Sequence, residues 1–286
     1  MSRDRSRSGS LSHQVQSALG GRLRIGLSKH AAKANGTASE GIYSWETYRS
    51  YMKHCNYFTD YCKSEHGCRT LKDCRQYANE WLQCRIDKNL SPYTLKLEVS
   101  ALSKLYGCKS SDFIATPSRH RSKITRSRLD VKRDKNFSTA KNEPFVRFCQ
   151  STGLRRSELR ALTGDQLEQR DGKFFIRVDK GTKGGRIRYA PVVGDVQNVV
   201  NLMNRAGYGK VFAKKYSNAD IHGFRSDYAK TVYQLYARDI KDVPRAEVYH
   251  CRGDLKGVKY DKSAMLRASA ALGHNRISVI AGNYLR

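Results

Sequence analysis

The stretch Leu272-Gly-His-Asn-Arg-Ile-Ser-Val-Ile-Ala-Gly-Asn-Tyr-Leu-Arg286 decides how the rest of the sequence is interpreted. It places His274 after a Leu-Gly turn and Tyr284 one short helical stretch later. Free tyrosine is a poor nucleophile because its phenol ionises only near about pH 10. Covalent chemistry through Tyr284 would need neighbours that stabilise a phenolate or a negatively charged transition state. Such neighbours have to come from upstream segments.

The composition is strongly basic. In 286 residues, 54 Lys and Arg stand against 26 Asp and Glu, giving a formal net charge of +28. A field of this sign indicates a polyanionic partner, most simply nucleic acid, with salt-dependent binding. A ribosomal or RNA-coating protein is an alternative that charge alone leaves open.

Length and hydropathy suggest two modest domains, since a domain takes roughly 100–200 residues. The hydrophobic content of 39% suffices for ordinary cores. No run approaches the ~18 apolar residues of a membrane-spanning helix, and the N-terminus lacks the apolar centre of a signal peptide. We therefore expect a soluble cytoplasmic protein without a membrane partner.

Cysteines cluster between Cys55 and Cys84, but none forms a Cys-x-x-Cys pair. That spacing fits no common zinc module. Cys55 and Cys62 fall on one helical face together with Trp45 and Met52, so we predict reduced thiols in a core. A bound metal, and with it a zinc-organised RNA-binding module, is the alternative.

Residues 1–39 are rich in Ser, Arg and Gly, and this composition predicts a basic arm that is disordered or contacts DNA. A weak helical signal lies around residues 11–19. Residues 40–112 predict a helical domain. Its start signals are Ser44, the pair Thr70 and Asp73, and Ser91-Pro92; Gly107 is the stop signal.

Residues 113–136 have no apolar periodicity and predict a linker that follows a phosphate backbone. A merely solvated linker is the alternative. The basic residues expected to contact the DNA backbone are Arg119, Arg121, Lys123, Arg126, Arg128, Lys132 and Arg133.

Residues 137–286 predict a second domain that is mostly helical with an embedded hairpin. Alternation at 173–179 and 186–192 predicts two strands, joined by a glycine-rich tip at 180–185. The expected helices lie near 143–150, 153–162, 196–205, 218–238 and 262–272.

Two pairs of residues in this region have a spacing that would place their side chains next to each other on a helix, where they could act together on a phosphate. Arg155 and Glu158, like His222 and Arg225, lie three residues apart and share a helix face. Phosphoryl transfer spreads negative charge over the equatorial oxygens, which fixed guanidinium groups stabilise. No carboxylate cluster suited to magnesium accompanies them, so we expect a metal-free mechanism without a cofactor.

Four motifs in one order resemble the tyrosine recombinases, the phage-integrase superfamily. Thr152-Gly-Leu-Arg-Arg-Ser-Glu-Leu159 is similar to the first arginine motif of that family, and Lys180-Gly-Thr-Lys-Gly-Gly-Arg-Ile-Arg-Tyr-Ala-Pro-Val192 to its lysine hairpin. His222-Gly-Phe-Arg225 matches the His-x-x-Arg motif, and Leu272-Gly-His274 precedes the tyrosine. The resemblance covers roughly residues 43–286 and is most specific in the second half.

The resemblance implies a role for each motif residue. Arg155 and Arg225 would hold the non-bridging oxygens of the scissile phosphate, and Tyr284 would form a 3′-phosphotyrosyl link. Lys180, with Lys183 as the alternative, would protonate the departing 5′-oxygen.

The remaining motif residues would assist. His222 would act as an acid or base, His274 would hydrogen-bond the phosphate, and Glu158 would hold the arginines and histidine. A plain DNA-backbone contact is the alternative for Arg155, although Arg156 is the residue expected in that role. For Tyr284 a plain core position, and for the histidines an ordinary structural role, are the alternatives.

The implied fold is mainly α with a small β-hairpin or sheet. It has two domains, a helical core-binding (SAM-like) domain and an α+β catalytic domain at 137–286, which would clamp duplex DNA. The implied function is site-specific DNA recombination as a mobile-element or phage integrase. The enzyme would work as a homotetramer on two DNA sites, with accessory DNA-bending proteins as further candidate partners.

Two alternatives remain for the activity: cutting and resealing of one strand as in type IB topoisomerases, and DNA binding without catalysis. Two residues follow Tyr284 in this sequence, whereas many relatives continue into a tail that docks on a neighbouring subunit. How protomers would couple is therefore not indicated by this sequence.

Overall fold

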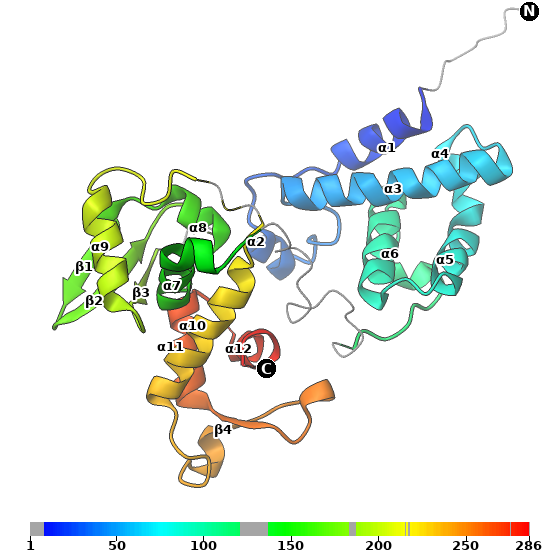
Figure 1. Cartoon of the computed structure of the whole chain (residues 1–286). Coiled ribbons are helices and arrows are strands. Elements are labelled where there is room, and N and C mark those ends of the chain that lie inside the picture. Colours follow the sequence, from blue (N-terminus) through cyan, green and yellow to red (C-terminus); the bar gives the residue numbers. More distant parts are fainter. Residues whose placement is uncertain are drawn as a thin grey trace, which may run out of the picture. The chain divides into compact units, whose positions relative to one another are not determined.

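The computed structural model describes residues 9–120, 137–182, 187–214, 216, 218–274 and 276–285. The chain divides into two compact units, Met1–Thr125 and Arg126–Arg286. The division falls within the predicted linker, most of which lies outside the described residues. As predicted, the fold is mainly α-helical with a small antiparallel sheet (Figure 1).

The first unit is helical. Its helices are α1 (Leu11–Gly20), α2 (Lys29–Ala34), α3 (Trp45–His66), α4 (Leu71–Cys74), α5 (Ala78–Asp87) and α6 (Pro92–Tyr106).

The predicted start and stop signals of these helices are confirmed. The Ser44 hydroxyl accepts a hydrogen bond from the Thr47 amide at the start of α3. Thr70 and Asp73 form a reciprocal capping box at the start of α4. Ser91 caps α6, which ends at Gly107 with a φ of 67°, a conformation that favours glycine.

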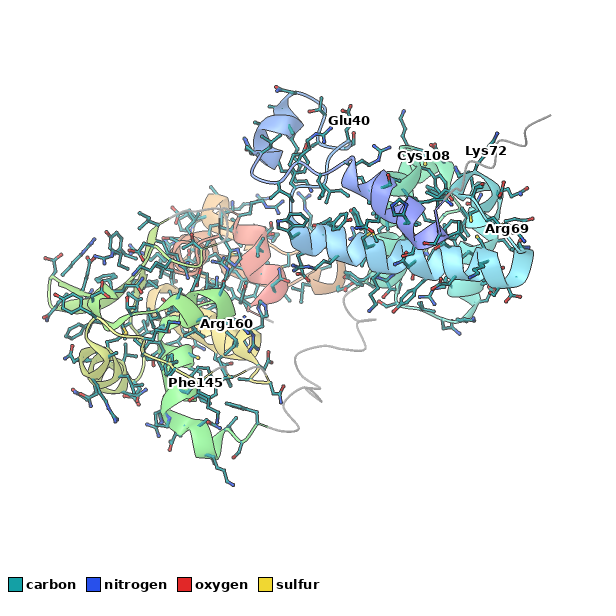
Figure 2. The ribbon with its side chains drawn as sticks, turned by 90° about the horizontal axis from the view of Figure 1, so that it is seen from above. Glu40, Arg69, Lys72, Cys108, Phe145 and Arg160 are labelled. Carbon is teal, nitrogen blue, oxygen red and sulfur yellow. The ribbon has the colours of Figure 1, made fainter. Side chains whose placement is uncertain are left out.

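The core of this unit surrounds α3 and includes Phe58, Leu82 and Leu102. Val15 and Leu19 of α1 are fully buried in the same core. Part of the segment assigned to a basic arm is therefore folded into the helical unit, because the apolar face of α1 packs on α3. Charged side chains of this unit are exposed at its surface, for example Arg69 and Lys72 around the start of α4 (Figure 2).

The thiols behave as predicted for most cysteines. Cys55, Cys62 and Cys74 are buried in the core, and all eight cysteines are free of disulfides. Within the described ranges, no group of three or more His, Cys, Asp or Glu side chains is arranged to hold a metal ion. The placement of Trp45 on the buried face was wrong: its side chain is 52% exposed because it is the first residue of α3, at the edge of the core.

The second unit combines helices with two small sheets. Its helices are α7 (Glu143–Thr152), α8 (Arg156–Ala161), α9 (Val196–Ala206), α10 (Ile221–Tyr236), α11 (Lys262–Leu272) and α12 (Ile277–Asn283). Its strands are β1 (Leu167–Arg170), β2 (Lys173–Val178), β3 (Arg188–Pro191), β4 (Val248–His250) and β5 (Lys259–Asp261).

Strand β2 is central in an antiparallel sheet of order β1-β2-β3, with Ile176 opposite Leu167 and Ala190. The alternation at 173–179 and 186–192 predicted β2 and β3, but not β1. The sequence did contain a signal for β1, the pair Asp171-Gly172, which is typical of a two-residue hairpin turn. In the structure both residues have the positive φ angles that such a turn requires.

Helix α10 organises the second unit. It packs against both α7 and α11 (Figure 1). One core, with Phe148, Ile176 and Val199, lies between the sheet, α7 and α9. The other includes Tyr228, Met265, Ile280 and Tyr284 from α10, α11 and the end of α12. Among the described residues, no helix is long and apolar enough to cross a membrane.

Candidate active site

Tyr284 lies directly after α12 and brings three distant segments together. Its side chain is 5% exposed, and its hydroxyl lies 3.1 Å from Nε2 of His274 and 3.4 Å from Nε of Arg225. Its carbonyl accepts a hydrogen bond of 2.8 Å from the Ser226 hydroxyl. These contacts hold the end of α12 on α10 and direct the phenol toward two cationic or polar groups.

Arg225 is the buried centre of this cluster, with only 1% of its surface exposed. It donates hydrogen bonds to the carbonyl oxygens of Gly153 and Leu272. Burial lowers the pKa of the guanidinium to about 10, so it still carries its charge near neutral pH. The carbonyl acceptors offset part of the cost of burying this charge.

Arg155 reaches the same point from the start of α8. Its Nη2 donates to the Leu272 carbonyl at 3.1 Å, the same oxygen that accepts from Arg225. Two guanidinium groups from separate helices therefore converge on one carbonyl, next to the turn that carries His274.

Glu158 fixes Arg155. Its Oε1 accepts from Arg155 Nη1 at 2.8 Å, and its Oε2 accepts from the Arg155 amide at 2.7 Å. Burial pushes the pKa of Glu158 upward, but Arg188 and Arg155 outweigh burial and hold it at about 2. Glu158 is thus an ionised group placed behind Arg155.

Lys180 is exposed, and its backbone passes next to the start of α8. Gly181 follows it with a φ of 68°, and a Cβ at Gly181 would lie 2.5 Å from the Ser157 carbonyl oxygen. The Ser157 hydroxyl also donates to the Gly181 carbonyl at 2.8 Å. The residue that follows Lys180 is therefore hydrogen-bonded to α8, the helix that begins directly after Arg155. The alternative lysine, Lys183, lies outside the described residues.

His222 lies one turn before Arg225 on α10 and is exposed. Of the residues expected on the DNA backbone, the structure describes Arg119, which is exposed and lies 5.7 Å from the Tyr93 ring centre. The other members of that set fall outside the described ranges: Arg121, Lys123, Arg126, Arg128, Lys132 and Arg133.

Two arginines differ from expectation. Arg156, expected on DNA, donates to the carbonyl oxygens of Tyr216 and Ala219 and holds the loop before α10. Arg188 had no expected role, yet it is 8% exposed and paired with Glu158. The strand alternation could have revealed it, because Arg188 lies two positions from buried Ala190 and so shares its face.

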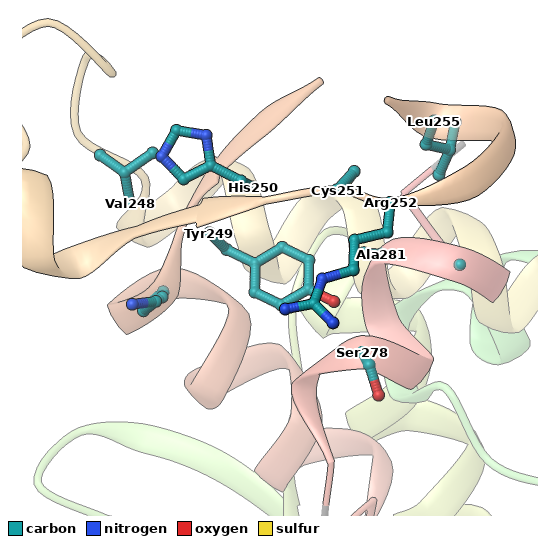
Figure 3. A pocket seen from close by; sticks show the side chains of 10 residues that line it. Val248, Tyr249, His250, Cys251, Arg252, Leu255, Ser278 and Ala281 are labelled. Atoms are coloured by element: carbon teal, nitrogen blue, oxygen red, sulfur yellow. The ribbon is translucent and has the colours of Figure 1, made fainter. Parts of the chain in front are cut away.

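A hollow of about 740 Å³ lies on another side of α12, between this helix and β4 (Figure 3). Tyr249, Arg252, Ser278 and Ala281 are among its lining residues. None of the six predicted catalytic residues lines it, so it is separate from the cluster around Tyr284.

The cluster has the parts needed for phosphoryl transfer by a tyrosine. A phenol oxygen lies beside an imidazole and a buried guanidinium, a second guanidinium joins them through Leu272, and a lysine-bearing segment is tied nearby. Such fixed cations stabilise the charge of a phosphoryl-transfer transition state.

No protein-family profile and no curated protein sequence matches this chain. Solved structures do resemble it. The Tn1549 transposon integrase in complex with circular intermediate DNA is 12% identical, with 97% of this chain and 96% of that chain covered and a TM-score of 0.52. XerH recombinase bound to its difH substrate is 12% identical, with 96% and 92% covered and a TM-score of 0.50.

These likenesses extend over nearly the whole of both chains. The fold of this chain is that of the tyrosine recombinases, as the sequence motifs predicted.

Proposed function

We propose that this protein is a site-specific tyrosine recombinase that cuts and rejoins DNA through a covalent phosphotyrosyl intermediate. The observation that supports this most directly is the convergence of Arg155 and Arg225 on the Leu272 carbonyl, with the Tyr284 hydroxyl 3.4 Å from Arg225. A phosphate bound beside the Tyr284 hydroxyl would be close to both guanidinium groups as well as to the phenol.

In the proposed reaction the Tyr284 oxygen attacks phosphorus while the bond to the 5′-oxygen breaks. Because His274 Nε2 lies 3.1 Å from the phenol oxygen, we assign this histidine the phenol proton in place of the phosphate contact that the resemblance implied. Lys180 gives a proton to the departing 5′-oxygen. Arg155 and Arg225 stabilise the non-bridging oxygens, and His222 assists from the start of α10. The phosphodiester bond energy stays in the 3′-phosphotyrosyl link, so rejoining needs no external energy source.

The excess of positive charge supports duplex DNA as the partner. Recombination joins two DNA sites, so the proposed working form is a tetramer with one protomer on each half-site. Both DNA complexes named above belong to recombinases or integrases, which also favours DNA as the substrate.

Trapping the covalent intermediate tests the proposal. Wild-type protein would be incubated with a pool of nicked duplexes of random sequence. Cleavage near the nick releases a short fragment that carries the new 5′-hydroxyl, so the cut strand cannot be rejoined. We expect a protein–DNA adduct that survives denaturation with detergent. Tyr284→Phe should bind the same pool and form no adduct, because the variant lacks the nucleophilic oxygen.

An adduct of equal yield on Tyr284→Phe would refute the nucleophile assignment. Absence of any adduct with wild-type protein that still binds DNA would favour a non-catalytic DNA-binding protein. Sequencing the trapped DNA would provide cognate sites, and joining of two such sites separates recombination from type IB topoisomerase activity, which only relaxes supercoils.

A further inference from the structure

Arg188 is a buried charged residue that none of the reacting steps uses. It lies at the first position of β3, with all three of its guanidinium nitrogens paired. Nη1 and Nη2 donate to the two carboxylate oxygens of Glu158 at 2.7 and 2.8 Å, and Nε donates to the Ala271 carbonyl at 3.1 Å. A side chain this completely bonded has one orientation.

The contact with Glu158 is bidentate, since each carboxylate oxygen accepts from a different guanidinium nitrogen, and such a contact restricts the orientation of the carboxylate. The same two oxygens accept from the Arg155 side chain and the Arg155 amide. The direction of Arg155 therefore depends on Glu158, and the direction of Glu158 depends on Arg188.

The other contact supports the turn after α11. Ala271 precedes Leu272, whose carbonyl accepts from both Arg155 and Arg225. Gly273 has a φ of 67°, and a Cβ there would lie 2.8 Å from Cδ of Arg188. The arginine side chain thus fills the space beneath the turn that leads to His274.

We propose that Arg188 is a positioning residue that holds Arg155, through Glu158, and the Leu272–His274 turn in one arrangement. It touches neither the phenol nor the expected phosphate site. The inference rests on the proposed recombinase function for its catalytic consequence, but its structural part can be measured without DNA.

The matched variants are Arg188→Gln, Arg188→Lys and Arg238→Gln. Arg238 also holds a buried carboxylate, Asp261, with Nε at 2.7 Å and Nη2 at 2.9 Å, and contacts none of the six catalytic candidates. Arg238→Gln therefore removes an equivalent fork in the same unit and controls for general destabilisation and for loss of one positive charge.

Adduct formation would be measured at saturating nicked DNA, alongside the DNA dissociation constant. For Arg188→Gln we expect the rate to fall by about 100-fold, since misplacement of a catalytic group by ~1 Å has that effect, while the dissociation constant changes less than about 3-fold. Arg188→Lys keeps the charge but not the fork, and should recover part of the rate. Arg238→Gln should react at close to the wild-type rate.

Hydrogen–deuterium exchange without DNA supplies the second readout. The amides of Gly273 and His274 bond to the carbonyls of Ala270 and Ser269. Peptides containing these amides should exchange faster in Arg188→Gln than in wild type or Arg238→Gln. If Arg188→Gln does not fold, Arg188→Lys is judged by the same two measurements.

Wild-type rate and unchanged exchange in the Arg188 variants would overturn the inference, as would equal losses in Arg238→Gln. Failure of the wild-type protein to form any adduct would instead refute the proposed function. In that case the exchange measurement alone decides whether Arg188 holds the turn.

Discussion

At the scale of single residues, the site depends on buried charges that are paired rather than exposed. Arg225 and Glu158 are almost inaccessible to solvent, and each has several hydrogen-bond partners. Removing one partner of a buried ion pair is more costly than the pair is worth, because the other charge then has no compensation. Substitutions here will therefore affect stability as well as chemistry.

Glu158 gives a pH-dependent prediction. Its folded-state pKa of about 2 lies below the model-compound value of 4.5, so ionised Glu158 stabilises the folded state above about pH 4.5. That contribution is lost as pH falls from about 4.5 to 2, and a shift of this size corresponds to about 3 kcal/mol. In Glu158→Gln the free energy of unfolding should depend less steeply on pH in this window.

Chemical denaturation followed by circular dichroism at several pH values between 2 and 6 would measure this difference. Identical pH dependence in Glu158→Gln and wild type would show that the carboxylate does not contribute through its ionisation.

At the scale of elements, the active site depends on where chain segments cross. The lysine-bearing segment crosses the start of α8 at Gly181, where only a hydrogen atom fits against the Ser157 carbonyl. The crossing places Lys180 beside the helix of Arg155, although the two are far apart in sequence.

Gly181→Ala should slow adduct formation, because a Cβ there would push the segment, and Lys180 with it, away from α8. Gly172→Ala is the matched control. Gly172 has a similar φ of 71°, but nothing lies within 4 Å of an added Cβ. Gly172→Ala should lose about 1 kcal/mol of stability through backbone strain, and Gly181→Ala should lose more because the clash adds to that strain. Equal adduct rates for the two would contradict the role of the crossing.

Helix α1 gives a second prediction at this scale. Leu19 is fully buried in the core of the first unit, whereas Leu27 is 62% exposed. Leu19→Ala should lower the free energy of unfolding of that unit by about 2–5 kcal/mol. Leu27→Ala should change it by less than about 0.5 kcal/mol.

The unfolding of this unit can be followed by tryptophan fluorescence, because both tryptophans of the chain, Trp45 and Trp81, belong to it. A Leu19→Ala protein as stable as Leu27→Ala would show that α1 is not part of the core.

At the scale of the whole molecule, the net charge of +28 leads to a prediction about the proposed DNA binding. We expect the logarithm of the binding constant to fall linearly with the logarithm of salt concentration, because each phosphate contact releases counterions. Six to ten such contacts would weaken binding by about 10³–10⁵ between 50 and 200 mM salt. Titrations of labelled duplex DNA across this range measure the slope, and a flat response would argue against backbone contacts.

Much of this protein could be predicted from its sequence. The caps at Ser44, Thr70 and Ser91 act on neighbouring residues, so a local pattern was enough to predict the helix starts. The motifs around Arg155, Arg225 and Tyr284 identified the candidate site because chemistry restricts which side chains can do this work. The basic composition indicated a polyanionic partner, since charge acts irrespective of fold.

Other features were decided by tertiary structure. No local pattern shows that Arg188 lies against Glu158, that Arg156 holds a loop, or that α1 joins the core. The alternation of β3 could place Arg188 on the buried face but could not identify Glu158 as its partner. A short amphipathic helix has the same local signature whether or not its apolar face is covered. Only the packing of distant segments determines which contact forms, because the energy of burial depends on what lies on the other side.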